Sequence, residues 1–152
     1  MAREIISERY LPDDRITQFI TSHHVLTLAT AMHNIPYCSA CFYVYVKEGN
    51  YFVFTTDIDT RHGHEMLTND TVSAAVSLET KIIGKIRGVQ ITGKVVKATG
   101  KEQQHAKKAY LKRFPVASLL KTTYWLLYPD FIKLTDNRLG FGTKLIWKKQ
   151  PM

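Results

Sequence analysis

Alternating apolar and polar positions run through most of the chain and predict β-strands. The alternation is clearest over residues 87–97, where Val89, Ile91 and Val95 face one way and two glycines mark bends or bulges. Residues 33–36 and 48–50 have the composition of turns. The predicted strands cover residues 25–30, 37–47, 51–55, 72–79, 87–97, 125–134 and 143–147.

Other segments repeat their apolar residues every three or four positions, as an amphipathic helix does. The first of these predicted helices places Ile16, Phe19 and Ile20 on one face. Pro115 ends the longest predicted helix. The predicted helices cover residues 12–23, 61–67 and 101–114, and residues 115–121 can form a further short helix.

Strands joined by hairpins, with few short helices between them, predict a mainly β fold with some α (α+β). The expected architecture is a closed or partly open antiparallel barrel. A doubly wound parallel sheet would need a more regular alternation of strand and helix. At 152 residues without a repeat or linker, the chain is expected to form a single domain over residues 1–152.

The strand predicted at residues 37–47 has an unusual aromatic face. Tyr37, Cys41, Tyr43 and Tyr45 share it, and such a face is too aromatic to be simply solvated. Two interpretations stay open. The face is buried inside the barrel, or it forms an interface with a second copy of the chain.

Cys38 and Cys41 form an isolated CxxC motif. A redox CxxC sits at a helix N-terminus, whereas on a strand these two positions point to opposite faces. A zinc site would need a second such pair. His62 and His64 are two residues apart and do not share a helical face. We expect two reduced thiols without a known role and no metal site.

The net charge of +8 is unevenly distributed. Residues 1–80 hold 5 basic residues (Lys or Arg) and 10 acidic residues (Asp or Glu), a net charge of −5. Residues 81–121 hold 11 basic residues and 1 acidic residue (+10), and residues 122–152 hold 5 basic and 2 acidic residues (+3). The middle segment is either a solvated basic face or a place for an anionic partner. Only Tyr110 and Phe114 provide aromatic rings within it, which counts against nucleic-acid binding.

The composition, with 45% hydrophobic and 22% charged residues, is typical of a soluble globular protein. No apolar run approaches the length that crosses a membrane. The first residues lack the apolar core of a signal peptide, so we expect a cytoplasmic protein. No nucleophile motif of the Gly-x-Ser-x-Gly type supports hydrolase chemistry.

The most specific chemistry lies where an apolar strand meets a polar turn and a helix. The strand ends in two hydroxyls, Thr55 and Thr56, and the helix opens with Thr60, Arg61 and His62. Thr60, or the aspartate before it, can cap the first turn. Helix N–H groups and cationic side chains at one end attract an anion. A phosphate site and a plain strand–turn–helix with an exposed arginine both fit this sequence.

This segment resembles the FMN-phosphate segment of the pyridoxamine 5′-phosphate oxidase-like split barrels. In those proteins the helix usually opens Ser-Arg-Lys or Ser-x-Lys, and its basic residues hold the phosphate. By position, Thr60 matches the hydroxyl, Arg61 the arginine and His62 the lysine. Because imidazole is only partly charged near neutrality, the resemblance implies weakened or pH-dependent flavin binding.

The order of elements over residues 12–148 also resembles the split barrel. Residues 86–90, 112–117 and 134–142 are similar to those of a small, poorly characterised group of bacterial proteins. In the split barrels FMN lies at a dimer interface, so the resemblance implies a homodimer. The cofactor-binding residues it implies are Thr60, Arg61 and His62 at the phosphate, Thr55 and Thr56 near the ribityl chain, and Arg87, Gln90 and Lys144 at the ring or phosphate.

True pyridoxamine phosphate oxidases carry Arg-x-His near their last strand. The matching triplet here is Arg138-Leu139-Gly140, which lacks the imidazole, so this activity is not expected. The resemblance instead implies an FMN-binding protein, and a flavin-dependent oxidoreductase whose substrate and catalytic residues the sequence does not identify. The alternative is a non-enzymatic binder of haem or another flat anionic ligand.

Overall fold

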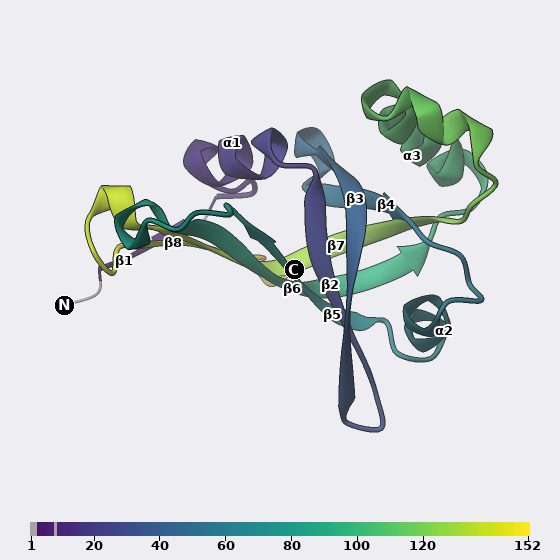
Figure 1. Ribbon diagram of the computed structural model, residues 1–152, viewed down its shortest axis with the longest axis horizontal. Helices are drawn as coiled ribbons and strands as arrows, with labels where there is room; N and C mark the ends of the chain where they lie inside the picture. The colour runs from purple at the N-terminus through teal and green to yellow at the C-terminus, as the bar shows by residue number, and fades with distance from the viewer. Residues whose placement is uncertain (1–2, 8) are drawn as a thin grey trace.

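A computed structural model of the chain describes residues 3–7 and 9–152. Eight strands form one sheet in the order β1-β8-β7-β4-β3-β2-β5-β6, and β6 also pairs with β7, which closes six strands into a barrel (Figure 1). The predicted α+β antiparallel barrel is therefore confirmed.

The strands are β1 (Glu4–Ser7), β2 (Val25–Met32), β3 (Ile35–Val46), β4 (Tyr51–Thr55), β5 (Thr71–Ser77), β6 (Arg87–Lys97), β7 (Tyr124–Asp136) and β8 (Lys144–Lys148). The helices are α1 (Asp14–Ser22), α2 (Arg61–Thr68) and α3 (Gly100–Arg113), with short 3₁₀ turns η1 (Lys47–Gly49), η2 (Ile83–Lys85), η3 (Pro115–Leu119) and η4 (Asn137–Leu139).

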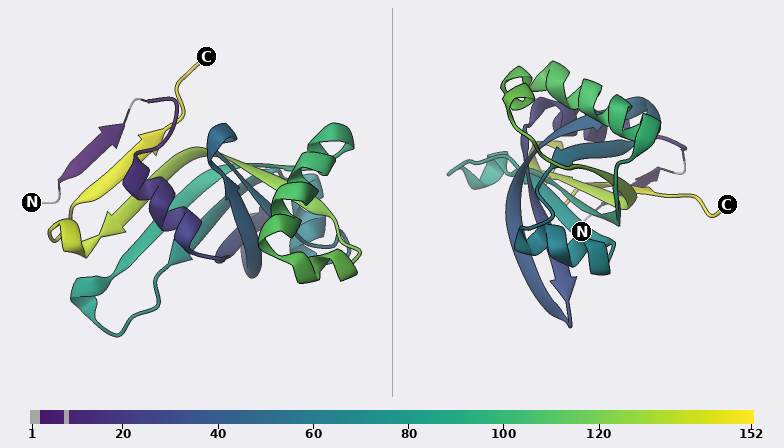
Figure 2. Two further views of the ribbon diagram at one scale, coloured as in Figure 1. Left: turned by 90° about the horizontal axis from the view of Figure 1, so that it is seen from above. Right: turned by 90° about the vertical axis from the view of Figure 1, so that its right-hand side faces the viewer.

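The long strand β7 accounts for the split in the barrel. Its residues 124–127 pair with β4, its residues 131–135 pair with β8, and β6 follows its other edge. Parallel pairing of β1 with β8 extends this end of the sheet into a wing (Figure 2). The register of β6 shifts at Gly93, where an added Cβ would lie 2.2 Å from the carbonyl oxygen of Tyr128. The predicted bulge is therefore present.

The aromatic face of β3 is largely buried inside the barrel. Tyr43 is fully buried and its hydroxyl donates to the carbonyl oxygen of Ile20 at 2.5 Å. Tyr45 is also buried and donates to Asn50 Oδ1 at 2.7 Å. Burial is thus the correct interpretation for these two tyrosines, whereas Tyr37 stays half-buried near the start of the strand.

Two boundaries differ from the sequence-based expectation. Strands β2 and β3 continue into the predicted turn at residues 33–36, so that only His33 and Asn34 form it, with φ of 53° and 62°. Two successive left-handed residues are the geometry of a tight type I′ hairpin. Strand β1 was not predicted, because four residues are too few to establish an alternation.

Helix α3 lies on the outside of the barrel and is joined to α1 by one arginine. Arg113, its last residue, donates to the carbonyl oxygens of Tyr43 at 3.3 Å, Thr21 at 2.9 Å and His23 at 2.6 Å. These acceptors belong to the C-terminal end of α1 and to β3, so the guanidinium holds three elements together.

We expect Arg113→Lys to lower the free energy of unfolding by about 1–2 kcal/mol, because a single ammonium cannot reach all three carbonyl oxygens. Urea denaturation would measure the loss. Lys112→Arg, at the exposed neighbouring position, serves as the control and should leave the midpoint unchanged. Equal midpoints for Arg113→Lys and the wild type would contradict the assignment.

The basic segment at residues 81–121 does not form one surface. Lys81 and Lys85 precede β6, within or next to η2, whereas Lys107 and Lys108 lie on α3, which follows the other end of β6. Within the described ranges, no helix is both long enough and apolar enough to cross a membrane.

Candidate functional site

The candidate site is the corner where β4 ends and α2 begins, called here the β4–α2 corner (residues 55–62). Thr60 is the N-cap: its Oγ1 accepts from the N–H of Gly63 at 3.1 Å, so of the two predicted caps this one is used. The N–H groups of Arg61 and His62 have no hydrogen-bond acceptor among the described residues. They remain available to an anion at the helix N-terminus.

Arg61 is held in place by a buried carboxylate. Its Nε donates to Glu65 Oε1 at 2.9 Å, and Thr30 Oγ1 donates to Oε2 of the same residue at 2.6 Å. The bond from Thr30, and then that from Arg61, holds the pKa of Glu65 below its usual range, so this carboxylate is ionised. The guanidinium also lies over the Tyr37 ring, 4.2 Å from its centroid. Its two terminal nitrogens make no hydrogen bond to any described residue and are left for a ligand.

His62 is oriented by the hydroxyls of the corner. Its Nε2 lies 2.5 Å from Thr56 Oγ1, which is 3.2 Å from Thr60 Oγ1. Burial lowers the pKa of His62 below its usual 6.5, against a weaker opposing effect of Glu65. The imidazole is therefore neutral near neutral pH, and Arg61 supplies the positive charge of the corner.

The two hydroxyls at the end of β4 face different partners. Thr56 is fixed by its backbone, which donates to the carbonyl of Thr123 and accepts from Trp125 Nε1, both at 3.1 Å. Thr55 Oγ1 instead donates to the Tyr110 hydroxyl at 3.3 Å, toward α3. The structure thus gathers Thr56 with the helix start and turns the Thr55 side chain away from it.

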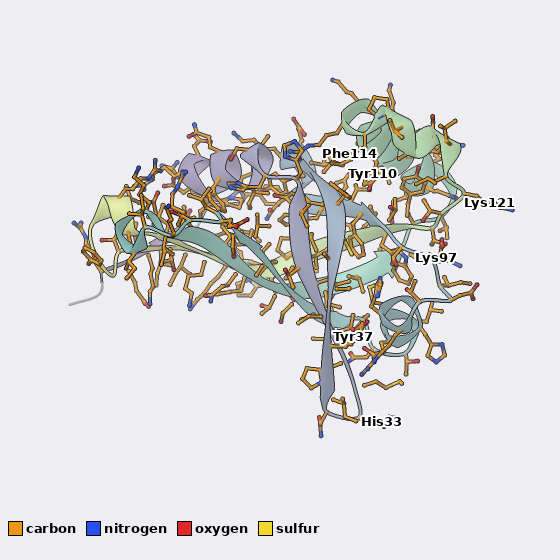
Figure 3. The ribbon with its side chains drawn as sticks, viewed as in Figure 1. His33, Tyr37, Lys97, Tyr110, Phe114 and Lys121 are labelled. Carbon is orange, nitrogen blue, oxygen red and sulfur yellow. The ribbon has the colours of Figure 1, made fainter. Side chains whose placement is uncertain are left out.

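The three remaining predicted residues do not join this corner within one chain. Gln90 is exposed on β6 and lines a shallow hollow of about 390 Å³. Arg87 begins β6, whereas Lys97, at the opposite end of that strand, lies near α2 (Figure 3). Lys144 pairs with Thr135 at the same far end as Arg87.

Comparison with known proteins agrees with this arrangement. The family model described as pyridoxamine 5′-phosphate oxidase matches residues 12–134. A UPF0306 protein of Photorhabdus laumondii is 38% identical over 134 residues, which cover 88% of this chain and 94% of that protein. Another UPF0306 protein, from Serratia proteamaculans, is 39% identical over 135 residues, which cover 89% of this chain and 94% of that protein.

The chain belongs to the pyridoxamine 5′-phosphate oxidase family and to its UPF0306 relatives. Solved structures agree on the fold. A haem-binding protein from Mycobacterium smegmatis superposes with a TM-score of 0.76 at 19% identity, over 88% of this chain and 56% of that one. A FAD-binding protein from Mesorhizobium loti gives 0.67 at 14% identity, over 79% and 89%. The resemblance stated from the sequence is confirmed.

The triplet Arg138-Leu139-Gly140 lies in the turn η4 and its C-cap. Arg138 donates to both carboxylate oxygens of Asp136, at 3.1 and 2.8 Å. Gly140 has a φ of 108°, a conformation that a histidine side chain would strain. The glycine at this position therefore matches the local backbone.

Sequence reasoning missed several residues of the corner. Glu65 follows Arg61 by four positions, and that helical spacing was a usable signal. Thr30 and Tyr37 come from the β2–β3 hairpin and lie far away along the chain. Nothing local in the sequence connects them to the start of α2.

The depressed pKa of His62 predicts a pH effect on stability. Because the folded state favours the neutral imidazole, this contribution is fully present above about pH 6.5 and is lost as the pH falls through the lower, folded-state pKa. Urea midpoints between pH 7.5 and 5 would measure it. His62→Asn keeps a polar partner for Thr56 but cannot titrate, so its midpoint should fall less on acidification. Parallel curves for the two proteins would contradict this account.

Proposed function

We propose that this protein is a cytoplasmic, homodimeric FMN-binding protein that acts as a flavin-dependent oxidoreductase. The observation that supports the proposal is that the first turn of α2 carries two unbonded N–H groups and an arginine, Arg61, whose terminal nitrogens have no partner among the described residues. A phosphate monoester accepts hydrogen bonds from all of these donors. The Glu65 carboxylate is already bonded by Arg61 and Thr30, so it does not compete for the corner.

The residues of the corner fit FMN with distinct roles. Arg61 would neutralise the phosphate, and the first N–H groups of α2 would bind its oxygens. His62 would act through Thr56, whose hydroxyl it orients next to Thr60. Thr55 remains a candidate for the outer edge of the ribityl site. Bound flavin supplies the hydride or electron chemistry, while the chain holds and orients it.

An exposed hollow on the single chain supports the homodimer. The hollow beside Gln90 is lined by the small side chains of Thr27, Ala29, Ser73 and Ala75, which suit close approach of a second copy. The flavin ring would lie in this region. In such a dimer, Arg87 and Lys144 would reach a flavin only across the interface, because they lie far from the corner of their own chain.

Haem is the alternative ligand, and one surface favours it. The turn η3 and its C-cap residue expose three apolar side chains, Val116, Leu119 and Leu120, at 77, 85 and 67%, close in the chain to Lys112 and Lys121. Apolar side chains rimmed by cations suit a flat ring with two carboxylates, and the Mycobacterium smegmatis protein of the same fold is named as haem-binding. Nucleic acid is the weaker candidate, because the basic segment is divided between two ends of the molecule.

The ultraviolet–visible spectrum of the purified protein, before and after adding FMN and removing the excess, tests the proposal. Retained flavin near one equivalent per protomer would support it. An intense haem band would favour the alternative. A colourless protein that also fails to retain FMN would refute the proposed cofactor.

A further inference from the structure

A second cationic cavity lies under α1, away from the β4–α2 corner. It has a volume of about 450 Å³ and opens between α1, the start of β6 and the end of β7. Three arginines line it from three different elements: Arg15 from α1, Arg87 from β6 and Arg138 from η4. Among the described residues of the lining there is one carboxylate, that of Asp136. The cavity thus has an excess of positive charge.

The ion pairs around the cavity do not neutralise it. Asp136 is 4% exposed, and both of its oxygens are occupied by the Arg138 side chain; Oδ1 also accepts from the Arg138 backbone at 3.0 Å. Arg15 is bonded through Nε and Nη2 to Asp13, at 2.9 Å each. Each of these guanidiniums keeps one terminal nitrogen without a partner among the described residues.

The Arg87 side chain makes no hydrogen bond or salt bridge in the part of the chain that the structure describes, although its charge, after the stronger effect of the hydrogen bond from Arg138, contributes to the lowered pKa of Asp136. Its Nε is buried and lacks a hydrogen-bond acceptor. The guanidinium lies 5.7 Å from the centroid of the Phe19 ring, a contact that stabilises the cation but satisfies no N–H group. Burying a charged donor without an acceptor is destabilising, so its placement here needs another reason.

We propose that this cavity binds a small oxyanion, carried as a phosphate or carboxylate group on a small molecule. Arg87 Nε would donate the central hydrogen bond, and the remaining terminal nitrogens of Arg15 and Arg138 would close around the anion. The volume lies within the range of small-molecule sites. Arg87 lies at one end of β6 and the β4–α2 corner lies near the other end, so within one chain this cavity is separate from that corner.

Adding inorganic phosphate to the flavin-free protein tests the proposal. Isothermal titration calorimetry would measure the affinity, and thermal unfolding would measure the change in melting temperature. Arg87→Met keeps much of the side-chain volume and removes the charge and the donors. We expect it to weaken phosphate binding at least tenfold. In phosphate-free buffer its melting temperature should equal or exceed that of the wild type, because an unsatisfied buried donor has been removed. Lys107→Gln, the same change of charge on exposed α3, should bind phosphate normally.

Malonate, tested in parallel, separates the two ligand chemistries, and selective binding of either anion supports the proposal. Equal affinity of wild type and Arg87→Met for both anions would overturn it. So would an equal loss in Lys107→Gln, which would reveal general charge screening. A marked fall in the melting temperature of Arg87→Met without ligand would also overturn it, because Arg87 would then serve the fold itself.

Discussion

Replacing Arg61 by Met together with Glu65 by Gln is expected to preserve the fold and to weaken FMN binding on the order of 100-fold, or about 2.7 kcal/mol. Arg61 would provide the only full positive charge at the phosphate, since His62 is neutral near pH 7. The double change is needed because Glu65 is buried beneath Arg61 and bonded to it. Removing the arginine alone would leave that carboxylate without its cation.

The single variants complete the test. Arg61→Met should lose both stability and FMN affinity, whereas Glu65→Gln, which keeps its bond from Thr30, should retain most of the affinity. Flavin fluorescence titration and urea denaturation would measure the two quantities separately. If the stable double variant binds FMN as tightly as the wild type, the phosphate does not lie at Arg61.

Gly63→Ala is expected to destabilise the protein by about 2–3 kcal/mol and to abolish FMN binding. Alanine favours a helix over glycine by about 1 kcal/mol, so the sequence alone would predict the opposite sign. In the structure, however, a Cβ at Gly63 would lie 2.2 Å from the carbonyl oxygen of Asp57 and 2.9 Å from Thr60 Oγ1. The turn before α2 would have to move, and the N-cap would move with it.

Gly84→Ala is the matched control, because an added Cβ there meets nothing within 4 Å. Its urea midpoint and FMN affinity should remain those of the wild type. A stabilised Gly63→Ala variant with normal affinity would mean that the β4–α2 corner tolerates displacement and does not require its present geometry.

Local patterns predicted the parts of this molecule that depend on local interactions. The alternation in β6 revealed its inward face, and the polar turn before Arg61 located the start of α2. Capping by Thr60 depends on a hydrogen bond from the N–H of Gly63, a residue only three positions further along the chain. Such features are determined by neighbours in the chain, so the sequence was enough to predict them.

Long-range contacts could not be predicted in this way. Arg113 donates to carbonyl groups 70 to 92 positions earlier, and backbone acceptors leave no trace in side-chain composition. The resemblance implies that Arg87 and Arg61 both contact the cofactor, and the register of β6 and β7 keeps the two residues apart within one chain. Only the three-dimensional path of β6 reveals this separation.

The parallel pairing of β1 with β8 has a consequence for how the chain assembles during synthesis. Residues 4–7 are synthesised well before their strand partner, residues 144–147. Closing that contact requires all the residues between the two strands, so it contributes slow, non-local folding. The six-stranded barrel contains neither β1 nor β8, so it can close before these two strands pair.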